Sequence, residues 1–240
     1  MKTLKTIIYF LTILIIVISI NSCYMLCVSG EGEIEKETFN ISDFNKLKLN
    51  VDADIELIQS DEFLVTIEAQ RNIIENIILE TKKGALKIKY DQCVSNHKNI
   101  NIIISLPLVK CVDLNGSGTV KTMDRFNVED LELNINGSGE IYMDVKADEI
   151  ESNINGSGDI YLKGTTDKLD VEINGSGSVQ AFAMKTDYST VKINGSGDCK
   201  LNVFEKLNVK ISGSGDVIYK GPVSNINTKI SGSGEIKRLD

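Results

Sequence analysis

Leu114-Asn115-Gly116-Ser117-Gly118-Thr119-Val120 is the first of seven closely similar heptapeptides in this chain of 240 residues. The other copies occupy residues 135–141, 154–160, 173–179, 193–199, 211–217 and 230–236. Their first glycines recur every 18 to 21 residues, at Gly116, Gly137, Gly156, Gly175, Gly195, Gly213 and Gly232. A period near 20 residues with one invariant motif is typical of a stacked-repeat protein.

Each heptapeptide reads apolar, Asn or Ser, Gly, Ser, Gly, variable, apolar. The flanking Leu, Ile and Val residues suit strands that face a core. Both glycines of each heptapeptide suit a sharp corner, because glycine reaches positive φ without a Cβ clash. The second glycines are Gly118, Gly139, Gly158, Gly177, Gly197, Gly215 and Gly234. Each unit is therefore predicted to be a strand, a corner and a strand.

Two all-β folds can use this corner. In a parallel β-helix each period is one coil, and equivalent residues stack about 4.8 Å apart. In an antiparallel meander, Asn-Gly would form hairpin tips, and every second turn should carry a signature of its own. The intervening turns vary, for example Lys146-Ala147-Asp148 and Lys185-Thr186-Asp187. One invariant type of corner favours the solenoid, with about seven Gly-Ser-Gly coils.

Stacking predicts two rows of polar side chains. The first is an amide row that can hydrogen-bond along the stack, formed by Asn115, Asn136, Asn155, Asn174 and Asn194 and continued by Ser212 and Ser231. The second, called here the acidic row, contains Thr119, Glu140, Asp159, Ser178, Asp198, Asp216 and Glu235. Like charges one coil apart repel, so the acidic row should face solvent or hold cations. Its five carboxylates form a candidate binding row.

Residues 1–22 resemble a secretory leader. Lys2 and Lys5 precede an apolar run of about 15 residues, which is short for a membrane span. The run ends in Ile20-Asn21-Ser22-Cys23, similar to a bacterial lipobox, and this implies cleavage and lipidation at Cys23. Cys27 fits the lipobox pattern poorly, and an ordinary signal peptide or an uncleaved anchor stays open. Acyl chains on Cys23 would hold the chain on a membrane, with residues 23–32 as a tether.

The charge balance is acidic. Loss of residues 1–22 removes two lysines and no acids, so the net charge falls from −8 to −10. Such a charge argues against nucleic acid and anionic lipid head groups as partners. The hydrophobic content of 42% indicates a globular chain.

Residues 33–113 alternate apolar and polar positions and predict strands, for example at Leu47, Leu49 and Val51. Residues 70–78 could form one or two helical turns. No linker separates this half from the repeats at 114–240, so residues 33–240 are expected to form one β domain.

The order of several short motifs resembles one bacterial cell-envelope family, the putative auto-transporter adhesin, head GIN domain family. These motifs lie at residues 39–47, 51–57, 84–88 and 104–108 and lead into the Gly-Ser-Gly series. The resemblance covers about residues 33–236. It implies a right-handed β-helix or β-roll and an adhesin label, and it supplies no catalytic residues.

Catalytic and metal motifs are weak. His97, the only histidine, lies in a polar stretch without a nucleophile motif. Cys199 occupies a slot that Val or Ile fills in the other repeats and is expected to be a small buried hydrophobe. Cys93 and Cys111 could pair in an oxidising periplasm. There is no Cys/His cluster typical of zinc and no calcium-binding nonapeptide, so no metal or cofactor is predicted.

These observations favour a non-enzymatic cell-envelope lipoprotein, anchored by Cys23 to the outer membrane, on either its periplasmic or its outer side. The solenoid would be an adhesin or binding scaffold for a glycan, matrix or cell-surface ligand. Two alternatives stay open. One is a polysaccharide-active enzyme that uses Asp159, Asp198 and Asp216, and the other is a structural envelope protein without a specific ligand. The oligomeric state is left open.

Overall fold

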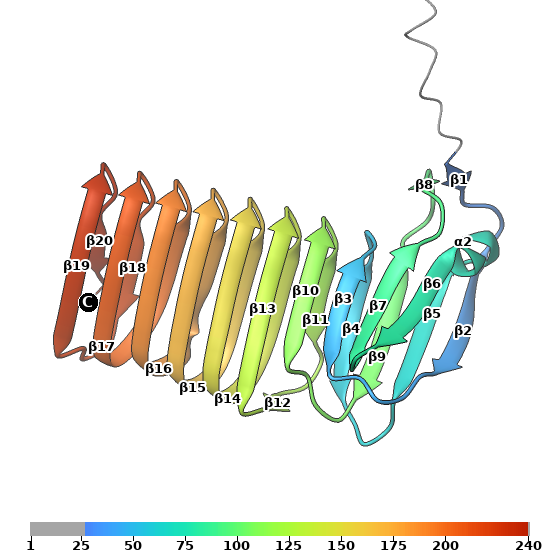
Figure 1. Ribbon diagram of the computed structural model, residues 1–240, viewed down its shortest axis with the longest axis horizontal. Coiled ribbons are helices and arrows are strands. Elements are labelled where there is room, and N and C mark those ends of the chain that lie inside the picture. The colour runs from blue at the N-terminus through green and yellow to red at the C-terminus, as the bar shows by residue number, and fades with distance from the viewer. Residues whose placement is uncertain (1–26, 240) are drawn as a thin grey trace, which may run out of the picture.

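The computed structural model describes residues 27–239 and shows an elongated all-β solenoid (Figure 1). Strands make up 70% of the chain and helix 2%. The coils stack side by side from β10 to β20, and a differently built set of strands lies at the N-terminal end (Figure 1). Within residues 27–239 no helix is long and apolar enough to span a membrane.

The repeat strands lengthen in the middle of the solenoid, where one bent strand makes a whole coil. They are β10 (Cys111–Gly116), β11 (Thr119–Thr122), β12 (Phe126–Asn127), β13 (Asp130–Gly137), β14 (Glu140–Gly156), β15 (Asp159–Gly175), β16 (Ser178–Gly195), β17 (Asp198–Gly213), β18 (Val217–Lys220), β19 (Asn225–Gly232) and β20 (Ile236–Arg238).

Successive coils pair in parallel with equivalent residues in register. Asn136 of β13 lies beside Asn155 of β14, which lies beside Asn174 of β15. The pairing continues from β15 through β16 and β17 to β19. The predicted solenoid is therefore confirmed, and the antiparallel meander is wrong for these repeats.

The two glycines of a corner are needed for different reasons. Gly156 has a φ of 137°, which favours glycine, and a Cβ there would lie 2.3 Å from the carbonyl oxygen of Gly137 in the preceding coil. Gly158 is not among the positive-φ residues, yet its Cβ would lie 2.5 Å from the Gly139 oxygen. Positive φ was expected for both glycines. The second one is required instead by the close approach of two backbones.

The core lies between two sheet walls. The first wall, here wall A, contains the strand that enters each Gly-Ser-Gly corner, and wall B contains the strand that leaves it. Alternate residues of both walls point inward and are buried, such as Ile154, Ile160 and Ile173. Cys199 is fully buried in the slot beside Val217 and Val179, which confirms its prediction as a small hydrophobe.

The N-terminal half extends both walls and then changes their direction. Its elements are β1 (Val28–Ser29), β2 (Ile34–Asn40), β3 (Lys46–Asn50), β4 (Asp54–Gln59), β5 (Leu64–Gln70), α2 (Arg71–Glu75), β6 (Ile77–Lys82), β7 (Ala85–Tyr90), β8 (Val94–Ser95) and β9 (Asn101–Leu106). In wall A, β10 pairs with β3 and β3 with β7, both in parallel, before β7 pairs with β6 antiparallel. In wall B, β11, β4 and β9 are parallel neighbours, and β5 and β2 follow antiparallel.

The helix α2 joins β5 of wall B to β6 of wall A at this end of the stack (Figure 1). It buries Ile73 and Ile74 and lies within the range where helical turns were predicted. Because the alternation of apolar residues is the same in parallel and antiparallel strands, the sequence did not reveal the change of direction.

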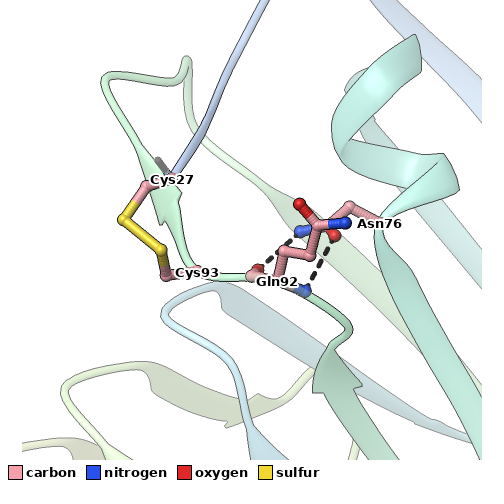
Figure 2. Close-up of a disulfide and its surroundings, with 4 residues drawn as sticks. All are labelled: Cys27, Asn76, Gln92 and Cys93. Carbon is pink, nitrogen blue, oxygen red and sulfur yellow. Dashed lines mark hydrogen bonds between the residues drawn. A yellow bond between two sulfur atoms is a disulfide. The ribbon is translucent and has the colours of Figure 1, made fainter. Parts of the chain in front are cut away.

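The structure answers one question about this half that the sequence left open, whether Cys93 and Cys111 pair, and it differs from one expectation, the tether. Cys93 forms a disulfide with Cys27, with 4.7 Å between their Cα atoms (Figure 2). Cys111 is free and buried. Residues 27–32 were expected to belong to a tether, yet the disulfide and the parallel pairing of β1 with β8 hold them against the domain. Spacing alone cannot select a disulfide partner, because the pairing depends on tertiary contacts.

Candidate binding surfaces

The acidic row lies along one edge of the stack, beside the corners. Glu140 is in register with Asp159, Asp159 with Ser178, and Ser178 with Asp198. The structure therefore places the predicted residues in one line. The line continues to Asp216 and Glu235 through hydrogen bonds from their backbone amides to the carboxylate of the preceding coil, rather than through strand pairs.

Three of these carboxylates accept hydrogen bonds from the backbone of the next coil. An Oδ1 atom of Asp159 accepts from the Ser178 amide at 2.9 Å and from the Ser178 hydroxyl at 2.6 Å. Asp198 accepts from the Asp216 amide at 2.9 Å, and Asp216 from the Glu235 amide at 2.8 Å. Three aspartates of the acidic row, Asp159, Asp198 and Asp216, therefore have a structural role, because each accepts from a backbone N–H group of the next coil. The two glutamates differ, since Glu140 accepts from a tyrosine hydroxyl and Glu235 pairs with Lys237.

Metal binding finds no support in the geometry. Among residues 27–239 no group of three or more His, Cys, Asp and Glu side chains is placed to hold a metal ion. Calcium sites need six to eight oxygen ligands around one point. A line of single carboxylates, three of them occupied by backbone amides, does not supply such a shell.

A second surface lies on the outward side of wall B, two residues after Glu140 and Asp159. Here Tyr142 and Tyr161 are in register, and their rings stack with centroids 4.4 Å apart and planes 3° from parallel. The Tyr142 hydroxyl donates to Glu140 at 2.8 Å. Partial burial, together with the neighbouring carboxylates, raises the pKa of both phenols, so they stay protonated and can donate hydrogen bonds at neutral pH.

The tyrosine stack forms one side of a hollow of about 380 Å³, which we call the tyrosine hollow. Other residues that line it include Met123, whose side chain is exposed, and Asp144, Lys163 and Gln180. Their mixture of apolar and polar groups matches the lining of many ligand sites.

Asp144 is held in place by two cations. Its Oδ1 atom is 2.7 Å from Arg125 Nε, and its Oδ2 atom is 3.1 Å from Lys163 Nζ. Burial acts to raise the pKa of Asp144, but the hydrogen bonds and charges of Arg125 and Lys163 outweigh it and lower the pKa. The hollow therefore presents a fixed carboxylate, ammonium and amide groups, and two phenols.

The sequence analysis missed the tyrosine hollow. A signal was present, because Tyr142 and Tyr161 follow Glu140-Ile141 and Asp159-Ile160 at the same position of successive repeats. Stacking of identical side chains was inferred for the asparagines and could have been extended to this pair. Arg125 carries no repeat signature and could not have been placed.

The amide row is confirmed where it contains asparagine. Each Nδ2 group donates to the Oδ1 atom of the previous coil, at 3.1 Å from Asn136 to Asn115 and at 2.9 Å from Asn194 to Asn174. The bonds from Asn155 and Asn174 are both 3.2 Å. A further amide pair, Asn153 donating to Asn134 at 3.0 Å, was not predicted.

His97 lines a hollow of about 160 Å³ with Asp52, Asp54 and Ser117. Its Nδ1 atom lies 2.8 Å from the carbonyl oxygen of Lys98, its own neighbour in the chain. Among the described residues no hydrogen bond joins His97 to a serine or an aspartate, which a Ser-His-Asp triad requires. The free thiols are equally poor nucleophiles, since burial raises the pKa of Cys199, and burial with nearby Asp113 raises that of Cys111 to about 12.

Comparison with known proteins agrees with the fold and with the resemblance noted from the sequence. The family described as putative auto-transporter adhesin, head GIN domain, matches residues 43–222, and the chain belongs to this family. Such an adhesin-like family indicates a protein of the cell envelope or cell surface. No curated protein matches the chain.

Several solved structures share the fold. A putative adhesin from Bacteroides fragilis superimposes with a TM-score of 0.83 at 22% identity, covering 88% of this chain and 100% of its own. A putative lipid binding protein from Parabacteroides distasonis gives 0.76 at 24% identity, covering 89% and 99%. A putative adhesin from Parabacteroides merdae gives 0.73 at 21% identity, also covering 89% and 99%. At these identities the likeness concerns the fold alone.

Proposed function

We propose that this protein is a lipid-anchored binding scaffold of the cell envelope, an adhesin whose ligand surface is the tyrosine hollow. The observation that carries the proposal is the stacked pair Tyr142 and Tyr161 beside the fixed Asp144. Aromatic edges with phenol, amide and charged groups suit a ligand with both apolar and hydroxyl-bearing surfaces, as a glycan has. The proposal treats the protein as non-enzymatic.

Anchoring through Cys23 is a second part of the proposal. Cys27 is engaged with Cys93, so the disulfide leaves Cys23 as the lipobox cysteine. Only four residue steps separate Cys23 from Cys27, a reach of roughly 14 Å at full extension. A domain tied so closely to acyl chains would be held at the membrane surface rather than on a long flexible stalk.

The test is a glycan-array and cell-surface binding assay with the wild-type chain and single variants. Tyr142→Ala and Tyr161→Ala should each reduce saturable binding by about tenfold, the effect of losing one well-packed aromatic contact. Tyr188→Ala is the matched control, because Tyr188 is an exposed tyrosine that is not among the residues lining the hollow. Equal binding by all three variants would overturn the assignment of the ligand surface.

The same samples separate the alternatives. An enzyme would release products from a polysaccharide, and Asp198→Ala or Asp216→Ala alone would stop that release. Binding through the acidic row would be abolished by Asp159→Lys while Tyr142→Ala retained it. A structural envelope protein would show neither binding nor turnover, only an envelope defect on deletion. Acylation is tested by metabolic labelling with a fatty acid, which Cys23→Ser should abolish.

A further inference from the structure

The last coil leaves a strand edge uncovered. Wall A ends at β19, which pairs with β17 on one side, and among the described residues no strand pairs with its other side. All eight residues of β19 are exposed, including the inward-facing Ile226 and Ile230, whose exposed fractions are 39% and 42%. An edge strand with exposed apolar residues is a template for pairing with another chain.

This edge lacks the features that normally discourage pairing. Edge strands are usually protected by charged residues, proline, bulges or a covering element. The β19 strand carries one charge, Lys229, and no proline. By contrast, the β2 edge at the other end of the molecule contains Glu35, Lys36 and Glu37.

We infer that β19 is a self-association surface, on which β19 of a second copy of this chain pairs antiparallel about a two-fold axis at Thr228. Residues Ile226, Thr228 and Ile230 point inward, because they are in register with Leu207, Val209 and Ile211 of the core. In an antiparallel pair, residues directly opposite each other lie on the same face. A shift by one residue would oppose inward and outward side chains, so only registers that keep the inward set together are compatible.

The side chains of β19 select one register among these. With the axis at Thr228, each Ile226 lies opposite Ile230 of the second copy, and each Lys229 lies opposite Asn227. With the axis at Lys229, two lysines would meet directly, which is destabilising. With the axis at Asn227, Ile226 would face Thr228 and the apolar pairing would be lost. Of these three axes, only the one at Thr228 places isoleucine opposite isoleucine without placing lysine opposite lysine.

Pairing of two β19 strands about a two-fold axis gives a closed dimer. A two-fold contact uses the same surface of both copies and leaves no β19 edge free, so it gives a dimer rather than a fibre. Head-to-tail growth would need an open N-terminal end, where β2, β6 and α2 terminate the walls. The terminal strand of wall B, β20, carries two cations, Lys237 and Arg238, which disfavour pairing with a second β20. The dimer therefore depends on β19 and should dissociate on dilution.

Disulfide trapping in cells that produce the full chain tests this inference. The axis brings Thr228 opposite its own copy, with Cα atoms about 4.5–5.5 Å apart, within disulfide range. Thr228→Cys should therefore give a disulfide-linked dimer under mild oxidation. Asn227→Cys is the matched control, since residue 227 lies diagonally from its copy at about 7–8 Å. We expect about tenfold more dimer from Thr228→Cys.

Register is tested by co-production of two variants. Asn227→Cys and Lys229→Cys should crosslink when present together, because these positions are opposite each other, and each alone should crosslink weakly. Thr228→Lys should abolish the concentration-dependent dimer of the uncrosslinked protein in sedimentation. These exposed positions are tolerant of substitution in the monomer, so loss of folding does not explain a negative result. Equal trapping by Thr228→Cys and Asn227→Cys, or a monomer at all concentrations, would overturn the inference.

Discussion

The two ends of the solenoid are built in opposite ways. At the N-terminal end the walls turn from parallel to antiparallel, and α2 buries Ile73 and Ile74 between them. At the C-terminal end the last repeat stops without such elements among the described residues, and Ile226 and Ile230 stay exposed. The difference shows that the repeat motif specifies how coils propagate but not how the stack ends. Ending it requires a different local sequence.

The largest expected effect is the difference in lost stability between replacing a glycine in an interior corner and replacing the equivalent glycine in the first corner. Gly156→Ala would place a Cβ 2.3 Å from the Gly137 oxygen, whereas a Cβ at Gly116 meets nothing within 4 Å. Both glycines have positive φ, 137° and 125°. We expect Gly156→Ala to cost at least about 3 kcal/mol of unfolding free energy and Gly116→Ala about 1–2 kcal/mol from backbone strain. Urea unfolding followed by circular dichroism measures both, and equal costs would contradict the stacking explanation.

Reduction of the disulfide should weaken the N-terminal end. Cys27 and Cys93 close a loop with a sequence separation of 66, and opening it should cost about 2–4 kcal/mol. Thermal melting with and without dithiothreitol checks this in the wild-type chain. Cys93→Ser should melt at the temperature of the reduced wild type and be unaffected by reductant. A wild type indifferent to reductant would mean that the end is held by packing alone.

The amide row should show a smaller difference between its interior and its end. Asn155 donates to Asn136 and accepts from Asn174, whereas Asn115 only accepts, from Asn136. Asn155→Ala should therefore cost about 1–2 kcal/mol and Asn115→Ala about half as much. The urea midpoints of the two variants measure these costs. An Asn115 variant as unstable as the Asn155 variant would contradict the expected difference between the end and the interior of the row.

The smallest effect is the pH dependence of the Asp144 ion pairs. Its pKa is lower in the folded state than the ordinary value of 3.8, so the unfolded chain binds the proton more readily. The stabilisation is present above pH 3.8 and is lost as pH falls through the lower folded pKa. Because Arg125 and Lys163 are largely exposed, we expect less than about 1 kcal/mol. The difference between wild type and Asp144→Asn should shrink on acidification, and growth of that difference would contradict the sign.

Sequence reasoning found what repeats and missed what occurs once. The period and the corner motif predicted the parallel coils, the Asn115–Asn194 amide row and the buried Cys199, because stacking converts a period in sequence into neighbours in space. The Cys27–Cys93 disulfide and the antiparallel strands of the N-terminal end depend on contacts between unique segments. The acidic row was placed in a line, but its hydrogen bonds to corner amides could not be read from composition.

The central claim is that identical corners lie directly above one another along one axis. Pulsed electron paramagnetic resonance tests it with spin labels on cysteines substituted for Ser138, Ser214 and Ser233, in a chain that also carries Cys23→Ser. Buried Cys111 and Cys199, with their raised pKa values, should stay unlabelled. Ser138 and Ser214 are four coils apart and Ser138 and Ser233 five, so the account predicts backbone separations of about 19 and 24 Å. Separations that do not grow by one strand spacing per coil would contradict it.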